Sequence, residues 1–169
     1  ALATGANGEL YAGGDFGVMG DSTRSRVAAL DPFTGAVHGW NPNVNGRVSA
    51  LAATGSNIVI GGTFTQVRGK PRQNIALWDG LADSLSAWNP GANASVTSLD
   101  ATPSSVRAVG QFTTAGGQAR SKAAEPMVKF DEVARKVLRQ THLDCKSRDA
   151  QPLPVRLDRT GGNVEAGCS

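Results

Sequence analysis

Short apolar runs, separated by turn residues, recur along the chain. Residues 47–51 alternate polar and apolar side chains, which is typical of a half-buried strand, and residues 58–61 form a short apolar run. Residues 74–78 and 84–88 continue this pattern after segments that are rich in Gly, Asn and Pro. The pattern therefore predicts four short antiparallel strands between residues 47 and 88.

The same pattern returns with a period of 48 residues. Gly13-Gly14-Asp15-Phe16 reappears as Gly61-Gly62-Thr63-Phe64 and, more weakly, as Val109-Gly110-Gln111-Phe112. Three further landmarks keep the period, namely an arginine, a turn aspartate and a Trp-Asn-Pro sequence: Arg24, Arg72 and Arg120; Asp31 and Asp79; Trp40-Asn41-Pro42 and Trp88-Asn89-Pro90. The agreement extends over about 130 residues, which indicates an internal repeat.

Four antiparallel strands in each repeat are typical of a β-propeller blade. We expect an all-β fold with units at residues 1–47, 48–95 and 96–140, followed by an irregular tail at 141–169. Closed propellers have about four to eight blades, so three units predict an open or incomplete ring. Sequence missing from this chain, or another copy of it, would supply the remaining blades; we favour missing sequence, because the chain opens without a Met and part-way through a strand.

The repeated glycines and phenylalanines are interpreted as structural. Glycine permits close approach of the backbone at the end of the second strand, and a phenylalanine at a fixed period is typical of packing between repeats. The residues in this group are Gly13, Gly14, Phe16, Gly61, Gly62, Phe64 and Phe112.

The second unit carries the motifs Val48-Ser49-Ala50-Leu51, Ile58-Val59-Ile60-Gly61-Gly62-Thr63-Phe64 and Ile75-Ala76-Leu77-Trp78-Asp79. With Arg72 and Trp88-Asn89-Pro90, these motifs resemble the delta-60 type β-propeller repeat. The resemblance implies a secreted or cell-surface bacterial protein. Kelch repeats share the glycine pair and the length, but their Tyr-then-Trp order is absent here, so a kelch-like propeller is the second choice.

The third unit departs from the pattern. Val109 replaces the first glycine, Gln140 stands where a Trp is expected, and four extra residues precede Asp131. We predict its third and fourth strands at 127–130 and 136–139, while a short helix at 132–138 competes with the last of these.

Composition narrows the class of protein. Only 18% of the 169 residues are charged and 21 are glycine, which fits a turn-rich β protein better than a helical bundle. The net charge of +3 arises after residue 117, where a single aromatic residue, Phe130, stands among the basic ones, so nucleic-acid binding is not expected. No apolar run has the length of about 18 residues that a membrane span requires.

Both cysteines, Cys145 and Cys168, lie in the tail. We predict a disulfide between them, which requires an oxidising, extracellular or cell-surface location. A pair of free or metal-binding thiols is the alternative, but His38 and His142 are the only histidines, so a four-ligand zinc site is poorly supported. No cofactor or metal is predicted.

No known catalytic motif is present, so the sequence favours a non-catalytic module that binds a protein or a glycan, or serves as a scaffold. The alternative is the propeller portion of a secreted carbohydrate-active enzyme whose active site lies partly outside this chain. Trp beside Asn can stack on a sugar and hydrogen-bond its hydroxyls, although repetition favours a structural role for the Trp. The possible ligand face comprises Asp15, Asp21, Trp40, Asn41, Trp88 and Asn89.

Overall fold

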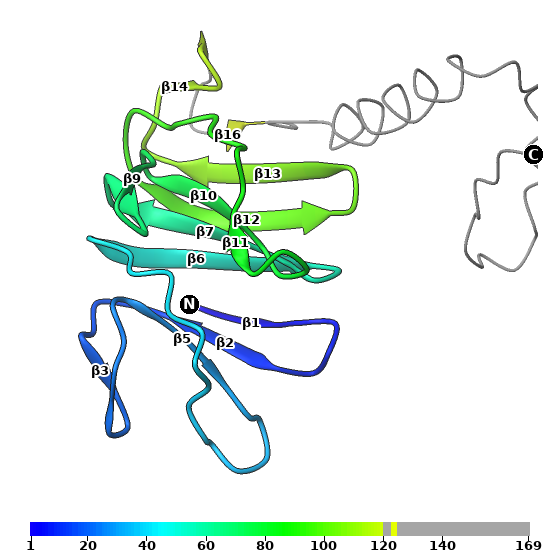
Figure 1. Ribbon diagram of the computed structural model, residues 1–169. Helices are drawn as coiled ribbons and strands as arrows, with labels where there is room; N and C mark the ends of the chain where they lie inside the picture. Colours follow the sequence, from blue (N-terminus) through cyan, green and yellow to red (C-terminus); the bar gives the residue numbers. More distant parts are fainter. Residues whose placement is uncertain (120–122, 125–169) are drawn as a thin grey trace, which may run out of the picture. The chain divides into compact units, whose positions relative to one another are not determined.

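The computed structural model describes residues 1–119 and 123–124, and all regular elements in this part of the chain are β-strands (Figure 1). Three antiparallel sheets dominate. The first contains β1 (Leu2–Thr4), β2 (Leu10–Gly13) and β5 (Val27–Leu30). The second contains β6 (Arg47–Thr54), β7 (Asn57–Thr63), β10 (Ile75–Asp79) and β11 (Ser84–Leu85). The third contains β12 (Val96–Thr102), β13 (Ser105–Gly110) and β16 (Ala123–Ala124).

Each sheet is accompanied by a small two-stranded hairpin. The hairpins are β3 (Val18–Met19) with β4 (Ser22–Thr23), β8 (Gln66–Val67) with β9 (Lys70–Pro71), and β14 (Thr114–Ala115) with β15 (Gln118–Ala119). The protein is therefore all-β over the described residues, as predicted. The described part contains no helix with the length and hydropathy needed to cross a membrane.

The 48-residue period of the sequence is also the period of strand pairing. Ala28 pairs with Ala12, Ala76 with Ile60, and Ala124 with Ala108, so the third strand keeps one register in all three sheets. The first two strands of the second sheet contain a bulge between Val48 and Ala50, and the third sheet repeats it between Val96 and Ser98. Equivalent residues thus occupy equivalent places in the fold.

The fourth strand is shorter than predicted. In the first unit it is reduced to one bridge between Leu30 and Val37, and in the second unit only Ser84–Leu85 is strand. The chain then turns away, and the carbonyl oxygens of His38 and Ser86 accept hydrogen bonds from the Nη2 atoms of Arg24 and Arg72, at 2.6 Å each. The repeated arginines therefore fix the point at which each fourth strand ends.

The third unit keeps the register of the other two as far as the structure describes it. Its strand β16 at Ala123–Ala124 pairs with β13 at the positions that the third strand takes in the other units, so the 48-residue spacing holds up to residue 124. The segments at 127–130, 132–138 and 136–139, and the tail at 141–169, lie outside the described residues.

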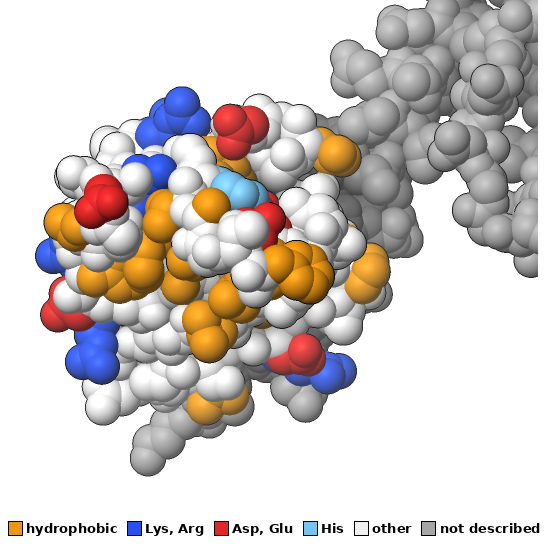
Figure 2. Space-filling model, turned by 90° about the horizontal axis from the view of Figure 1, so that it is seen from below, with side chains coloured by type: hydrophobic (Ala, Val, Ile, Leu, Met, Phe, Trp, Pro, Cys, Tyr) orange, Lys and Arg blue, Asp and Glu red, His pale blue; other side chains and the backbone are white. Residues whose placement is uncertain are grey.

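The sheets pack face to face, with β6 against β1 and β2, and β12 against β6 and β7 (Figure 1). This stacking covers both faces of the second sheet. As a result Ile58–Gly62 is buried at every position. In a sheet with one solvent-exposed face, buried and exposed residues would alternate along the strand. By contrast, hydrophobic side chains gather on the face of the first sheet seen in Figure 2. Leu2 and Phe33 of this unit are 69% and 95% exposed.

Glycines at the ends of β2 and β7 receive side chains from the next sheet. A Cβ atom on Gly13 would lie 2.6 Å from Cγ1 of Val48, and one on Gly61 would lie 2.8 Å from Cγ1 of Val96. Gly62 faces backbone instead, because its Cβ would lie 2.1 Å from the carbonyl oxygen of Arg47. Neither Gly61 nor Gly62 has a positive φ, so close packing, and not backbone conformation, requires glycine there.

The repeated phenylalanines are not equally buried. Phe64 and Phe112 are 3% and 0% exposed, whereas Phe16 is half-buried, against the prediction of three buried positions. Phe64 packs beside Gly46, which lies in the segment that connects the first sheet to the second. Phe16 does not belong to the buried core cluster that contains Phe64, and its ring stays partly in contact with solvent.

Two asparagines tie the connecting segments to the hairpins. The Oδ1 atom of Asn45 accepts hydrogen bonds from the backbone N–H groups of Thr65 and Gln66, at 2.9 Å each, and its Nδ2 donates to Oγ1 of Thr65. Asn93 repeats all three bonds, to Thr113 and Thr114. We call Asn45 and Asn93 the clamp asparagines. They hold each connecting segment against the unit that follows it.

Candidate functional site

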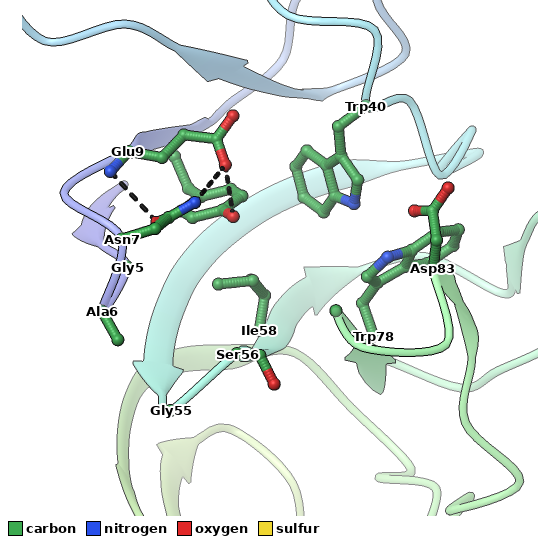
Figure 3. A pocket seen from close by; sticks show the side chains of 12 residues that line it. Gly5, Ala6, Asn7, Glu9, Trp40, Gly55, Ser56, Ile58, Trp78 and Asp83 are labelled. Atoms are coloured by element: carbon green, nitrogen blue, oxygen red, sulfur yellow. Dashed lines mark hydrogen bonds between the residues drawn. The ribbon is translucent and has the colours of Figure 1, made fainter.

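A cleft of about 480 Å³ opens where three turns meet at one end of the first two sheets (Figure 3). The β1–β2 turn contributes Gly5–Glu9, the β6–β7 turn contributes Gly55 and Ser56, and the β10–β11 turn contributes Gly80 and Asp83. Tyr11, Trp40, Ile58 and Trp78 complete the lining. The volume lies in the range of about 300–1,000 Å³ that is usual for small-molecule sites.

Three aromatic rings pack edge to face along this cleft. The ring centroids of Tyr11 and Trp40 are 5.1 Å apart at an interplanar angle of 82°, and those of Trp40 and Trp78 are 6.1 Å apart at 88°. The guanidinium of Arg68 lies 5.4 Å from the centroid of the Trp78 ring. Trp78 is buried, while Trp40 is half-buried. The cleft therefore has a rigid aromatic wall with one ring accessible to solvent.

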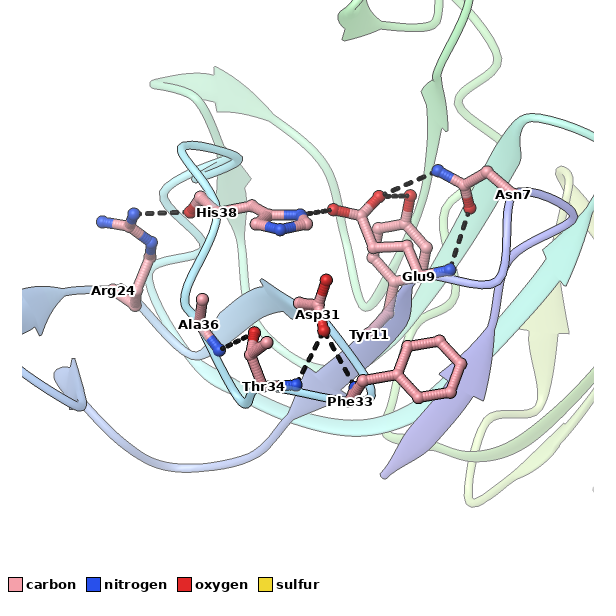
Figure 4. A network of polar contacts seen from close by, with 9 residues as sticks. All are labelled: Asn7, Glu9, Tyr11, Arg24, Asp31, Phe33, Thr34, Ala36 and His38. Atoms are coloured by element: carbon pink, nitrogen blue, oxygen red, sulfur yellow. Dashed lines mark hydrogen bonds and ion pairs between the residues drawn. The ribbon is translucent and has the colours of Figure 1, made fainter.

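Glu9 is the centre of a polar network beside the aromatic wall (Figure 4). Its Oε2 accepts hydrogen bonds from the hydroxyl of Tyr11 at 2.7 Å and from Nδ2 of Asn7 at 3.2 Å, and its Oε1 contacts Nδ1 of His38. The backbone N–H of Glu9 donates to Oδ1 of Asn7, which fixes the turn. Glu9 and Tyr11 lie two residues apart, but His38 comes from the segment after β5, so this network ties the β1–β2 turn to that segment.

The network shifts the pKa values of two of its members. Burial raises the pKa of Glu9, but the hydrogen bonds from Tyr11, His38 and Asn7 outweigh burial and hold that pKa below its usual value of 4.5. Burial, and then the hydrogen bond to the Glu9 carboxylate, raise the pKa of Tyr11 well above its usual value of 10.0. Near neutral pH the pair is therefore a carboxylate that accepts a hydrogen bond from a neutral phenol.

We expect Glu9→Gln to make the free energy of unfolding less dependent on pH in the acidic range. A carboxyl whose pKa is lower in the folded state stabilises the protein fully above its unfolded pKa of 4.5, and this contribution is lost as the pH falls through the folded pKa. The variant should be less stable than the parent by roughly 1 kcal/mol at neutral pH, with the difference closing in more acidic buffer. Urea denaturation between pH 7 and pH 3, by circular dichroism, measures it.

Asp100→Asn is the matched control for this experiment. Asp100 is exposed and pairs with an exposed Arg107 at 3.6 Å, so its removal should leave the pH profile close to that of the parent. Parallel pH profiles for the parent and Glu9→Gln would contradict the role assigned to the Glu9 network.

Asp83 lies on the opposite rim of the cleft. The turn that carries it is closed by Asp79, whose Oδ1 accepts hydrogen bonds from the N–H groups of Leu81 and Ala82 at 3.0 and 3.1 Å. Asp83 has a φ of 44°, and the equivalent residue of the first unit is Gly35 with a φ of 70°. Its side chain is exposed, and the carboxylate makes no hydrogen bond or ion pair with any described residue.

The structure places the predicted ligand-face residues in several locations. Trp40 lines the cleft, but Asp15 pairs with Nε of Arg26 at 3.0 Å beyond the far end of β2, and Asp21 lies in the β3–β4 turn. Asn41 accepts a hydrogen bond from the N–H of Ser25. Trp88 is half-buried and Asn89 is exposed, and neither lines the cleft. Of the six residues, only Trp40 therefore belongs to this site.

Several residues of the cleft were not singled out in the sequence, namely Asn7, Glu9, Tyr11, Trp78 and Asp83. A signal was present, because Glu9 and Tyr11 do not follow the repeat. Their equivalents in the second unit are Asn57 and Val59. Side chains that depart from a repeat are not explained by its packing, so they are the better candidates for a site.

The described residues contain no cluster of His, Cys, Asp and Glu able to hold a metal ion. The predicted disulfide partners, Cys145 and Cys168, lie outside the described residues. A scan against protein-family models finds no match to this chain, and neither do searches of curated proteins and of solved structures. The cleft itself is therefore the basis for assigning a function.

Proposed function

We propose that this chain is a non-catalytic repeat module of a secreted or cell-surface bacterial protein, built from β-propeller-type blades, and that it works by binding a protein or a glycan. The stacked, equivalent sheets support blades of an open ring. Further sequence or another copy of the chain would complete that ring.

One observation carries the proposal: repeated polar side chains hold the repeats together, while two carboxylates that depart from the repeat line one cleft. Asn45 and Asn93 make equivalent hydrogen bonds, and so do Arg24 and Arg72. Glu9 and Asp83, which break the repeat, instead line one cleft. A scaffold alone would not need that second group, so binding is favoured over a purely architectural role.

The chemistry at Glu9 favours binding over catalysis. Both carboxylate oxygens are engaged, by Tyr11, Asn7 and His38, and the pKa of Glu9 is held below its usual value. A general acid for glycoside cleavage needs a raised pKa, which is the opposite shift. The enzyme alternative rests on Glu9 and Asp83 lining one cleft.

Two assays on the full 169-residue chain test this function. The labelled protein is applied to a glycan array and to an extracellular-protein array, and it is incubated with a panel of aryl glycosides and oligosaccharides. We expect retention on one of the arrays without turnover of any substrate. Turnover that Asp83→Asn abolishes would overturn the non-catalytic assignment in favour of the carbohydrate-active enzyme, and the absence of both retention and turnover would leave the scaffold role in its place.

A further inference from the structure

We infer that the cleft between the first two sheets binds a neutral saccharide, which packs on Trp40 and hydrogen-bonds to the rim at Asp83 and Asn7. This inference rests on the proposed function and specifies its ligand. Three features of the cleft carry it: the aromatic wall, the polar groups left available on the rim, and the distribution of charge.

The aromatic wall suits the apolar face of a sugar ring. Trp40 is held in place by edge-to-face contacts with Tyr11 and Trp78, and it is half-buried and lines the cleft. A ring fixed in this way loses little conformational entropy when a ligand packs on it. Ile58, buried in β7, extends the apolar surface below the ring (Figure 3). The volume of about 480 Å³ suits a mono- or disaccharide better than a long chain.

The rim supplies hydrogen-bonding groups at positions set by turns. Asn7 is oriented by two hydrogen bonds with Glu9, which leave one amide N–H and one lone pair of its side chain for a ligand. Asp83 projects its carboxylate beside Trp40 with no partner among the described residues, and Ser56 is exposed on the neighbouring turn (Figure 3). Carboxylate and amide groups next to a partly exposed indole match the hydroxyl edge and the apolar face of one sugar ring.

The charges favour a neutral ligand. Glu9 and Asp83 line the cleft and no Lys or Arg does, so a uronic acid or a sugar phosphate would face like charge. An ammonium ligand is the competing small molecule, since aromatic rings and carboxylates also attract cations. However, the Glu9 oxygens are already engaged, and the guanidinium of Arg68 lies over the Trp78 ring. A neutral saccharide is therefore the better fit.

Titration of the full chain with defined ligands tests the inference. The probes are cellobiose, maltose, lactose and chitobiose, with glucuronic acid and choline as charged comparisons, and binding is followed by saturation-transfer NMR and by tryptophan fluorescence. We expect at least one neutral disaccharide to bind and both charged probes to fail. Asp83→Asn should weaken that binding about tenfold, because a hydrogen bond to a charged group is lost. Trp40→Phe should weaken it as well, since the packing surface shrinks.

Trp88→Phe is the matched control, because Trp88 is the repeat equivalent of Trp40 but does not line the cleft. It should bind like the parent. The exposed Asp83 side chain lets Asp83→Asn keep the parental melting temperature, so weaker binding there cannot reflect unfolding. The inference is overturned if no neutral disaccharide binds the folded parent, if binding survives both cleft variants, or if choline binds in place of sugars. Turnover of a bound sugar would overturn the non-catalytic function and leave the saccharide site standing.

Discussion

Replacing Gly62 with Val should lower the free energy of unfolding by more than about 2 kcal/mol. An added Cβ would lie 2.1 Å from the carbonyl oxygen of Arg47 and 2.9 Å from Cα of Val48. Both are backbone atoms of β6, which pairs with β7 along its whole length, so neither can move without breaking the ladder. Even Ala should destabilise the protein, because the clash begins at Cβ.

Chemical denaturation of the parent and the variant, monitored by tryptophan fluorescence, measures this effect. Gly39→Val is the control, because a Cβ at Gly39 meets nothing within 4 Å and its φ is not positive. The control should change stability by no more than about 0.5 kcal/mol. Equal stabilities for Gly62→Val and the parent would show that β6 and β7 do not approach each other at Gly62 as closely as described.

Phe64→Ala should be the other severe substitution, at about 3–5 kcal/mol. Phe64 is 3% exposed and belongs to the same buried cluster as Val44 of the connecting segment and Val48 of β6, so removal of its ring leaves a cavity in that cluster. Closing the cavity would require movement of the connecting segment, where Asn45 is fixed by three hydrogen bonds to the hairpin. The site can therefore collapse only in part.

The repeat supplies an internal comparison for this prediction. Phe16→Ala removes the same atoms from the equivalent position, but Phe16 is half-buried and does not belong to the buried cluster that contains Phe64. Its loss should reduce the free energy of unfolding by clearly less than the loss of Phe64, in the same denaturation assay. If the two variants were equally destabilised, the connecting segment would have no part in the packing of Phe64.

The repeat itself could be predicted from the sequence because its signals are local. Alternating residues predicted β6, a short apolar run predicted β7, and the repeated turn aspartate Asp31 indicated the turn after β5. The structure shows the reason for that turn: Oδ1 of Asp31 accepts hydrogen bonds from the N–H groups of Phe33 and Thr34, at 2.8 Å each. The same two bonds recur at Asp79 in the second unit.

The cleft could not be predicted in the same way, because its residues are distant in sequence and share no pattern. Glu9, Trp40 and Asp83 come together only through the stacking of two sheets and the course of the chain after β5. Repetition favoured a structural role for Trp40, and the structure places its ring in the aromatic wall and at the cleft together. A residue that fills a repeat position can therefore also belong to a site.

Because of the clamp asparagines, the 48-residue sequence repeat and the segment that is held together by hydrogen bonds have different boundaries. Counting from the first strand places a boundary at residues 47 and 48, but Asn45 binds Thr65 and Gln66 on the far side of it. The carbonyl oxygen of Pro42 likewise accepts a hydrogen bond from the N–H of Arg68. A truncated or transplanted second unit should thus begin near residue 42. A cut at residue 47 would remove Asn45 and Pro42, and with them the hydrogen bonds to the hairpin of that unit.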